Sequence, residues 1–192
     1  MKNIGLFGGT FDPIHMGHLI IAQAVQETLS LDTIVFIPSA RPPHKDADIM
    51  FSPEIRYTMI EHAVMGNETF TVSDSEMKRS GPSFTIDTIR ELKATAGNNS
   101  DFLFIVGKDN LYEIDKWKDP KGIVDECRII AADRPGSEDR AVPEWLLGKL
   151  ETVQVPLIDI SSSDIRRRIR AGLSIRYLVP EPVRRFIAGH IS

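Results

Sequence analysis

The first 38 residues constrain the fold most, because they alternate between strand and helix character. Residues 4–7 form an apolar run, a glycine turn follows, and a helical pattern begins near Gly17. One face of that predicted helix carries residues spaced three and four apart, namely His18, Ile21, Ala22, Val25 and Leu29. Residues 33–38 form a second apolar run, which ends at Pro38. This succession predicts a βαβ unit, in which a crossover helix joins two parallel strands.

Strand and helix patterns continue to alternate through the rest of the chain. Further apolar runs occupy residues 70–72, 102–106, 128–132 and 152–155, and helical patterns start near residues 53, 85, 144 and 182. Ser52 is expected to cap the helix at 53, and Ser83 or Thr85 the helix at 85, whereas residues 75–82 are a polar stretch. We therefore predict an α/β fold, a Rossmann-like doubly wound, mostly parallel sheet with a small C-terminal helical segment from about residue 160. No repeat or long linker divides the chain, so residues 1–192 are expected to form a single domain.

The composition excludes several classes of protein. The formal net charge of −4 argues against broad nucleic-acid binding, which needs a basic face. No apolar stretch approaches the roughly 18 residues that span a bilayer, and residues 1–3 lead into a predicted strand without a signal peptide. Cys127 is the one cysteine, so we expect a buried structural thiol in a reducing compartment. These features predict a cytoplasmic protein with no membrane partner.

Two glycine turns follow two predicted strands. Gly8 and Gly9 come directly after the first strand, and Gly107 with Asp109 after the strand at residues 102–106. In doubly wound sheets, ligands bind beyond the carboxyl ends of the strands, so both turns are expected to border one crevice. Trp117 follows shortly after, and the sequence leaves open whether it packs half-exposed or offers a flat stacking surface.

The unusual feature of the first turn is a pair of histidines, His15 and His18, separated by Met16 and Gly17. The H-E-x-x-H pattern of zinc proteases is absent and no third ligand is evident. Neither the Walker pattern nor G-x-G-x-x-G occurs. Residues three apart in a first helical turn are neighbours, so two imidazoles could contact adjacent phosphates of one nucleotide. No nucleophile is paired with a base, so a covalent enzyme intermediate is not indicated.

Two further segments each have two interpretations. Residues 160–170 combine Ser161, Ser162 and Ser163 with Arg166, which fits either a capped helix with a solvated basic side or a polyphosphate site. Residues 39–45 include two prolines before His44 and Lys45. That loop is either a rigid connector or a substrate-facing segment that presents Lys45 to an anion.

The order of these motifs resembles the nucleotidyltransferase superfamily. Residues 8–18 match its (H/T)-x-G-H signature, and residues 160–166 match its second signature, I-S-S-T-x-I-R. More narrowly, the chain is similar to the bacterial nicotinate mononucleotide adenylyltransferases in P-P-H-K at 42–45, S-F-T-I-D-T at 83–88, G-x-D at 107–109 followed by Trp117, and Y-L-V-P at 177–180. The resemblance covers nearly the whole chain.

The resemblance implies adenylyl transfer from ATP to nicotinate mononucleotide, which gives nicotinic acid adenine dinucleotide (deamido-NAD) and pyrophosphate in NAD biosynthesis. It implies catalytic roles for His15, His18 and Arg166. The implied ATP-binding residues are Gly8, Gly9, Thr10, Phe11, His15, His18, Gly107, Asp109, Ser161, Ser162 and Arg166. The implied residues for the nicotinate nucleotide are Lys45, Thr85, Trp117 and Arg134. Mg²⁺ is implied as a cofactor bound mainly through the ATP phosphates, without a dedicated protein site.

The chain departs from the family pattern at Lys108, where a small residue is expected, and at Ser163, where threonine is expected but the hydroxyl is kept. A phosphopantetheine adenylyltransferase shares the first and last motifs but lacks the P-P-H-K and S-x-T-I-D-T segments. A cytidylyltransferase fits less well, and the chain is too short and acidic for an aminoacyl-tRNA synthetase. A catalytically inactive nucleotide-binding module is the alternative from another class. The sequence leaves open the preference for acid over amide and the oligomeric state, a homodimer included.

Overall fold

A computed structural model describes residues 2–42, 49–97, 99–133 and 142–191, without the side chain of Asp109. The strands of this part of the chain are β1 (Lys2–Gly9), β2 (Thr33–Pro38), β3 (Phe70–Val72), β4 (Ser100–Gly107), β5 (Arg128–Asp133) and β6 (Leu150–Gln154). They form one sheet in the order β3-β2-β1-β4-β5-β6, and each neighbouring pair is parallel. The sheet is therefore wholly parallel over the described strands, where the sequence predicted a mostly parallel one.

The sheet changes direction at its centre. From β1 the chain moves outward to β2 and β3, and then returns to β4 on the other side of β1. In this register Phe7 of β1 aligns with Ile105 of β4, so the two strands end at the same level. This junction is the topological switch point at which doubly wound folds bind ligands.

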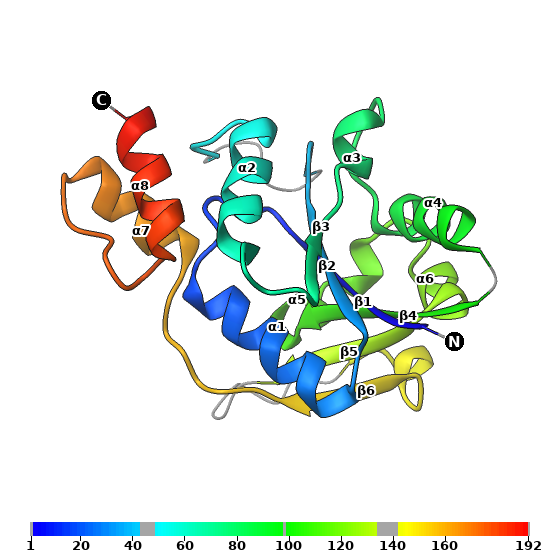
Figure 1. Ribbon diagram of the computed structural model, residues 1–192. Helices are drawn as coiled ribbons and strands as arrows, with labels where there is room; N and C mark the ends of the chain where they lie inside the picture. The colour runs from blue at the N-terminus through cyan, green and yellow to red at the C-terminus, as the bar shows by residue number, and fades with distance from the viewer. Residues whose placement is uncertain (1, 43–48, 98, 134–141, 192) are drawn as a thin grey trace.

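Helices cover both faces of the sheet (Figure 1). The α-helices are α1 (Met16–Leu29), α2 (Pro53–Val64), α3 (Ser75–Lys78), α4 (Thr85–Ala96), α5 (Lys108–Leu111), α6 (Pro120–Glu126), α7 (Ser162–Arg170) and α8 (Glu181–His190). Two short 3₁₀ turns are η1 (Ile114–Lys116) and η2 (Glu144–Leu146). Within the described segments, no helix combines the length and the apolarity that crossing a membrane requires.

The core is divided by the sheet into two clusters. Residues of α1, α2, α7 and α8 pack on one face, where Ile21, Met59, Ile165 and Val183 are buried. Residues of α4, α5 and α6 pack on the other face, with Ile89 among them. Because both faces are covered, the middle parts of β1, β2, β4 and β5 are almost continuously apolar, which is the pattern of a buried parallel sheet. The C-terminal helices α7 and α8 thus share one hydrophobic cluster with α1 and α2.

Two local predictions were wrong. The helix expected over 144–150 is only the turn η2, because Gly148 has a φ of 77° and Leu150 already pairs with Ile129 in β6. Phe84 is the N-cap of α4, and no side chain caps this helix, whereas Ser52 does cap α2. The hydroxyl of Ser83 instead accepts a hydrogen bond from the backbone N–H of Arg41. The polar stretch at 75–82, to which the sequence assigned no element, contains α3 with buried polar residues.

Candidate active site

A cavity of about 1160 Å³ lies across the switch point, between the ends of β1 and β4. It exceeds the roughly 300–1,000 Å³ of an ordinary small-molecule site, so it has room for more than one ligand of that size. The described residues predicted for the site line it together, namely Gly8, Gly9, Thr10, Phe11, His15, His18, Thr85, Gly107, Trp117, Ser161, Ser162 and Arg166. Lys45 and Arg134 lie outside the described residues, as does the side chain of Asp109.

The loop after β1 folds back on itself to reach the cavity. Phe11 has a φ of 50°, and its ring lies over Gly9, where an added Cβ would come within 2.9 Å of the ring. Only glycine allows this close approach, because it has no Cβ. The carbonyl of Gly9 accepts the backbone N–H of Ser39 at 2.9 Å, which ties this loop to the end of β2. The turn is thus shaped by packing and leaves its backbone at the cavity wall.

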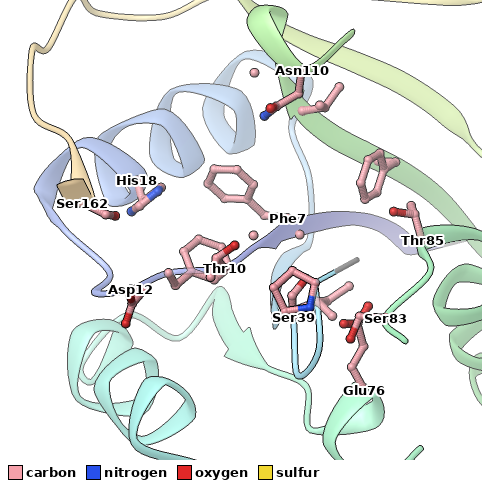
Figure 2. A pocket seen from close by; sticks show the side chains of 18 of the residues that line it. Phe7, Thr10, Asp12, His18, Ser39, Glu76, Ser83, Thr85, Asn110 and Ser162 are labelled. Atoms are coloured by element: carbon pink, nitrogen blue, oxygen red, sulfur yellow. The ribbon is translucent and has the colours of Figure 1, made fainter. Parts of the chain in front are cut away.

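His15 and His18 stand at the start of α1. Their rings are stacked, with centroids 3.7 Å apart and planes at 25°. The backbone N–H of His15 donates to Nδ1 of His18 at 3.3 Å. An imidazole nitrogen that accepts a hydrogen bond carries no proton, so neutral His18 holds its hydrogen on Nε2. That tautomer makes His18 a hydrogen-bond donor, as contact with a phosphate oxygen requires, and His18 points into the cavity (Figure 2).

The N-terminus of α7 meets the loop of β1 from about 150 residues downstream. Ser161 caps α7 by accepting the backbone N–H of Asp164 at 3.1 Å. The hydroxyl of Ser162 donates to the carbonyl of Pro13 at 2.9 Å, and Arg166 Nη1 donates to the carbonyl of Asp12 at 2.9 Å. The prediction that the serines cap this helix is confirmed. Its other alternative, a solvated basic side, is wrong for Arg166, which is only 9% exposed.

A buried carboxylate, which the sequence reasoning missed, organises this junction. Asp12 is 2% exposed, and its two oxygens accept the backbone N–H groups of Met50 and Phe51 at 2.8 and 2.9 Å. Arg56 is fully buried and donates to the carbonyls of Thr10 and Phe51 at 2.6 and 3.1 Å. Burial lowers the pKa of the Arg56 guanidinium below its ordinary value, and the Asp12 carboxylate opposes that shift. A buried charge needs such partners, but they lie too far apart in the sequence to be recognised there.

The other end of the cavity lies beyond β4. Thr85 is the first residue of α4, so its hydroxyl stands among backbone N–H groups that have no partner within the helix. Trp117 is half-buried and packs edge-on against Phe104, with ring centroids 6.0 Å apart. It also lines the cavity. The structure thus supports the interpretation of a half-exposed packing residue, whereas the use of the indole as a stacking surface stays a prediction. Lys108 Nζ lies 3.3 Å from Asp133 Oδ1, which links the ends of β4 and β5.

Comparisons with known proteins identify related chains. A family model described as cytidylyltransferase-like matches residues 6–168. The probable nicotinate-nucleotide adenylyltransferase of Lachnoclostridium phytofermentans is 38% identical over 197 residues, which cover 99% of this chain and 98% of that protein. The protein of the same description from Exiguobacterium sibiricum is 43% identical over 184 residues, covering 96% and 95%.

A similar fold occurs among solved structures. The nicotinic acid mononucleotide adenylyltransferase of Plasmodium falciparum, complexed with NaAD, superposes with a TM-score of 0.80 at 20% identity, covering 99% of this chain and 96% of that one. At this identity the likeness shows the fold alone. It is the doubly wound arrangement that the strand order describes.

Proposed function

The chain belongs to the cytidylyltransferase-like family, alongside the nicotinate-nucleotide adenylyltransferases, and from that membership we propose that it transfers the adenylyl group of ATP to nicotinate mononucleotide. The products are deamido-NAD and pyrophosphate, in NAD biosynthesis. The observation that carries this proposal is the cavity at the switch point, where His18 and Ser162 lie across from Thr85 (Figure 2) and Trp117 adds an aromatic ring to the lining. The half with His18 and Ser162 suits a triphosphate, and the other suits a flat ring with an acidic substituent.

The proposed chemistry is a direct in-line displacement at the α-phosphorus of ATP. The nucleophile is the 5′-phosphate oxygen of nicotinate mononucleotide, which is already anionic at neutral pH and needs no strong base. The new bond joins this oxygen to the α-phosphorus, and the bond to pyrophosphate breaks. Catalysis is then mostly alignment of two anions and stabilisation of the charge that grows on the phosphoryl oxygens.

The triphosphate half divides into two groups of residues. We assign His15 and His18 to the charge at the α-phosphate, with Thr10, Phe11 and the backbone of Gly8 and Gly9 as the floor beneath it. Ser161, Ser162 and Arg166 would hold the outgoing pyrophosphate at the N-terminus of α7, where backbone N–H groups favour anions. Gly107 and Asp109 would border the adenosine. The contacts of Ser162 and Arg166 to Pro13 and Asp12 support this assignment, because they fix the two groups to each other.

The nicotinate nucleotide is assigned to the wall formed by Thr85 and Trp117. The carboxylate of the ring would approach the N-terminus of α4 beside the hydroxyl of Thr85, and the ring would lie against the indole. Lys45 and Arg134 keep their assignment to this substrate from the resemblance alone. A carboxylate gains more than an amide from a helix N-terminus, so this geometry favours the acid form of the substrate.

Mg²⁺ is proposed to enter with ATP. The described residues include no group of three or more His, Cys, Asp or Glu side chains that could hold a metal ion. Asp12, the buried acid in the loop after β1, already accepts two backbone hydrogen bonds. The described side chains are therefore compatible with a Mg²⁺ ion that would be bound mainly by phosphate oxygens and water, as Mg²⁺ usually is in nucleotide sites. Such an ion would neutralise part of the negative charge on the triphosphate.

Three expectations stay predictions, namely the involvement of Mg²⁺, a homodimeric assembly and a cytoplasmic location.

The proposal is tested by comparing substrates at fixed ATP and Mg²⁺. We expect deamido-NAD from nicotinate mononucleotide, with a higher kcat/KM than the nicotinamide nucleotide gives. No product is expected from phosphopantetheine. Transfer to phosphopantetheine would favour the alternative adenylyltransferase, and nucleotide binding without any product would favour an inactive binding module.

A further inference from the structure

Glu76 is a buried acid in the cavity wall that neither the sequence motifs nor the proposed chemistry uses. It lies in α3 and is 7% exposed. Figure 2 shows its side chain reaching from α3 towards the cavity beside Ser83, on the wall that also carries Thr85 and opposite His18 and Ser162. It therefore stands at the end of the cavity assigned to the nicotinate nucleotide.

One carboxylate oxygen of Glu76 is firmly held. Oε1 accepts the hydroxyl of Thr88 at 2.8 Å, and that hydroxyl in turn accepts Nη2 of Arg79 at 2.7 Å. Arg79 also pairs through Nη1 with Glu91 at 3.1 Å. This chain of contacts holds Oε1 of the carboxylate near α4, one turn beyond Thr85.

The other oxygen, Oε2, is buried and has no hydrogen-bond partner in the part of the chain that the structure describes. A buried polar atom without a partner is costly, and more so on a charged group. Because the terminal torsion of a glutamate is broad, a small rotation turns Oε2 towards the cavity. A donor on a bound ligand would then offset the cost.

The donors of the substrate limit what that ligand group is. On the proposed function, nicotinate mononucleotide lies on this wall, and both its phosphate and its ring carboxylate only accept hydrogen bonds at neutral pH. Its remaining donors are the two hydroxyls of the ribose. We propose that Glu76 binds a ribose hydroxyl of the nicotinate nucleotide and thereby selects a ribonucleotide in the correct orientation. This inference rests on the proposed function and assigns a specificity-determining residue to it.

The experiment compares nicotinate mononucleotide with its 2′-deoxy and 3′-deoxy analogues. In the wild type, one analogue should lose about 10- to 100-fold in kcat/KM, which is the range of one hydrogen bond to a charged group. In Glu76→Gln the difference in kcat/KM between nicotinate mononucleotide and that analogue should shrink to a few-fold. The reason is that nicotinate mononucleotide loses a hydrogen bond in this variant, whereas the analogue never made it. The KM for ATP should stay within about twofold.

Glu91→Gln is the matched control, since Glu91 also pairs with Arg79 but is exposed and does not line the cavity. Glu91→Gln should show the same loss of kcat/KM with the deoxy analogue as the wild type. Equal use of all three nucleotides by the wild type would overturn the inference without any variant. A loss that persists in Glu76→Gln would overturn it as well. So would a variant that changes only the ratio of nicotinate to nicotinamide nucleotide, because the carboxylate would then face the ring substituent. Failure of the wild type to make deamido-NAD would instead refute the proposed function.

Discussion

His18 is the single residue on which the proposed chemistry depends most. Its Nδ1 accepts the backbone N–H of His15, and its ring packs edge-on against Phe11 with centroids 4.9 Å apart. Both contacts fix the imidazole so that Nε2 is the nitrogen that donates. A donor that is fixed before the reaction stabilises transition-state charge without reorganisation.

We predict that His18→Ala lowers kcat by about 10²- to 10³-fold, the loss typical of one charge-stabilising donor, and lowers the unfolding free energy by only about 1 kcal/mol. Steady-state kinetics and denaturant unfolding measure the two effects. His62→Ala is the control, because His62 packs on Phe186 and is absent from the cavity wall. Activity of the His18 variant within a few-fold of wild type would remove the histidine from the mechanism.

Cys127 gives a second prediction at this scale. The predicted burial of this thiol is confirmed, since Cys127 is 8% exposed and its Sγ contacts the carbonyl of Ile123 at 3.4 Å. Burial raises its pKa to about 12, against about 8.5 in an unfolded chain. Above about pH 9 the unfolded state loses this proton while the folded state keeps it, so stability falls as the pH rises towards 12.

The slope from this thiol approaches about 1.4 kcal/mol per pH unit when the unfolded thiol is fully ionised. Urea unfolding of the wild type and of Cys127→Ala between pH 8 and pH 10.5 gives the unfolding free energy of each protein as a function of pH. The difference between the two curves isolates the contribution of the thiol. Cys127→Ala should be less stable than the wild type at pH 8, because the substitution leaves a cavity. The difference in unfolding free energy between the two proteins should become smaller as the pH rises, because only the wild type loses stability through this thiol. Parallel profiles would contradict the buried neutral thiol.

At the scale of elements, the start of α1 shows how a helix terminus serves a site. Gly17 is buried in the first turn, and a Cβ there would lie 3.1 Å from Cε1 and Nδ1 of His15. The imidazole of His15 occupies the space that a side chain would fill. A glycine at position 17 therefore leaves room for the ring of His15, although glycine has a lower helix propensity than other residues.

Gly17→Ala should accordingly keep or slightly raise stability, by up to about 1 kcal/mol, while displacing His15 and lowering kcat by about 10-fold or more. Gly189→Ala in α8 is the matched control, because a Cβ there meets open space. It should leave kcat unchanged. Thermal unfolding and kinetics on both variants check this. An active Gly17 variant would show that the ring of His15 tolerates displacement.

Sequence patterns predicted the elements well wherever the signal was local. The strands at residues 33–38 and 70–72 and the helix that begins at Thr85 follow directly from apolar periodicity and a nearby break. The two glycine turns could be placed at one crevice because parallel strands end at a common edge. The residues predicted for the site and described by the structure do line one cavity, although their chemical roles stay predictions.

Patterns failed where the determining contact is distant. Asp12 is satisfied by Met50 and Phe51, and Arg166 reaches Asp12 across 154 residues. Glu76 is buried beside Thr88 and Arg79, which offset its charge, and the polar composition of residues 75–82 gave no sign of that burial. A buried charge is indistinguishable in sequence from a solvated one. Only the folded structure shows which acidic residues and arginines are buried away from solvent.

At the scale of the whole molecule, the strand order explains why one cavity can hold two substrates. The chain leaves β1 for one edge of the sheet and β4 for the other, so the helices that follow these strands diverge and open a crevice between them. α7 then closes one end through Ser162 and Arg166, and α4 forms the far wall with Thr85. On the proposed function, this arrangement would hold the two anionic substrates end to end, as direct transfer between them requires.

That central claim is tested most directly by pyrophosphate release in a single turnover. The enzyme, in excess, is mixed with ATP and Mg²⁺ either alone or together with nicotinate mononucleotide. With both substrates, we predict one equivalent of pyrophosphate per ATP, formed in step with deamido-NAD. With ATP alone we predict none, because no adenylyl-enzyme forms. A stoichiometric burst of pyrophosphate from ATP alone would contradict the direct transfer.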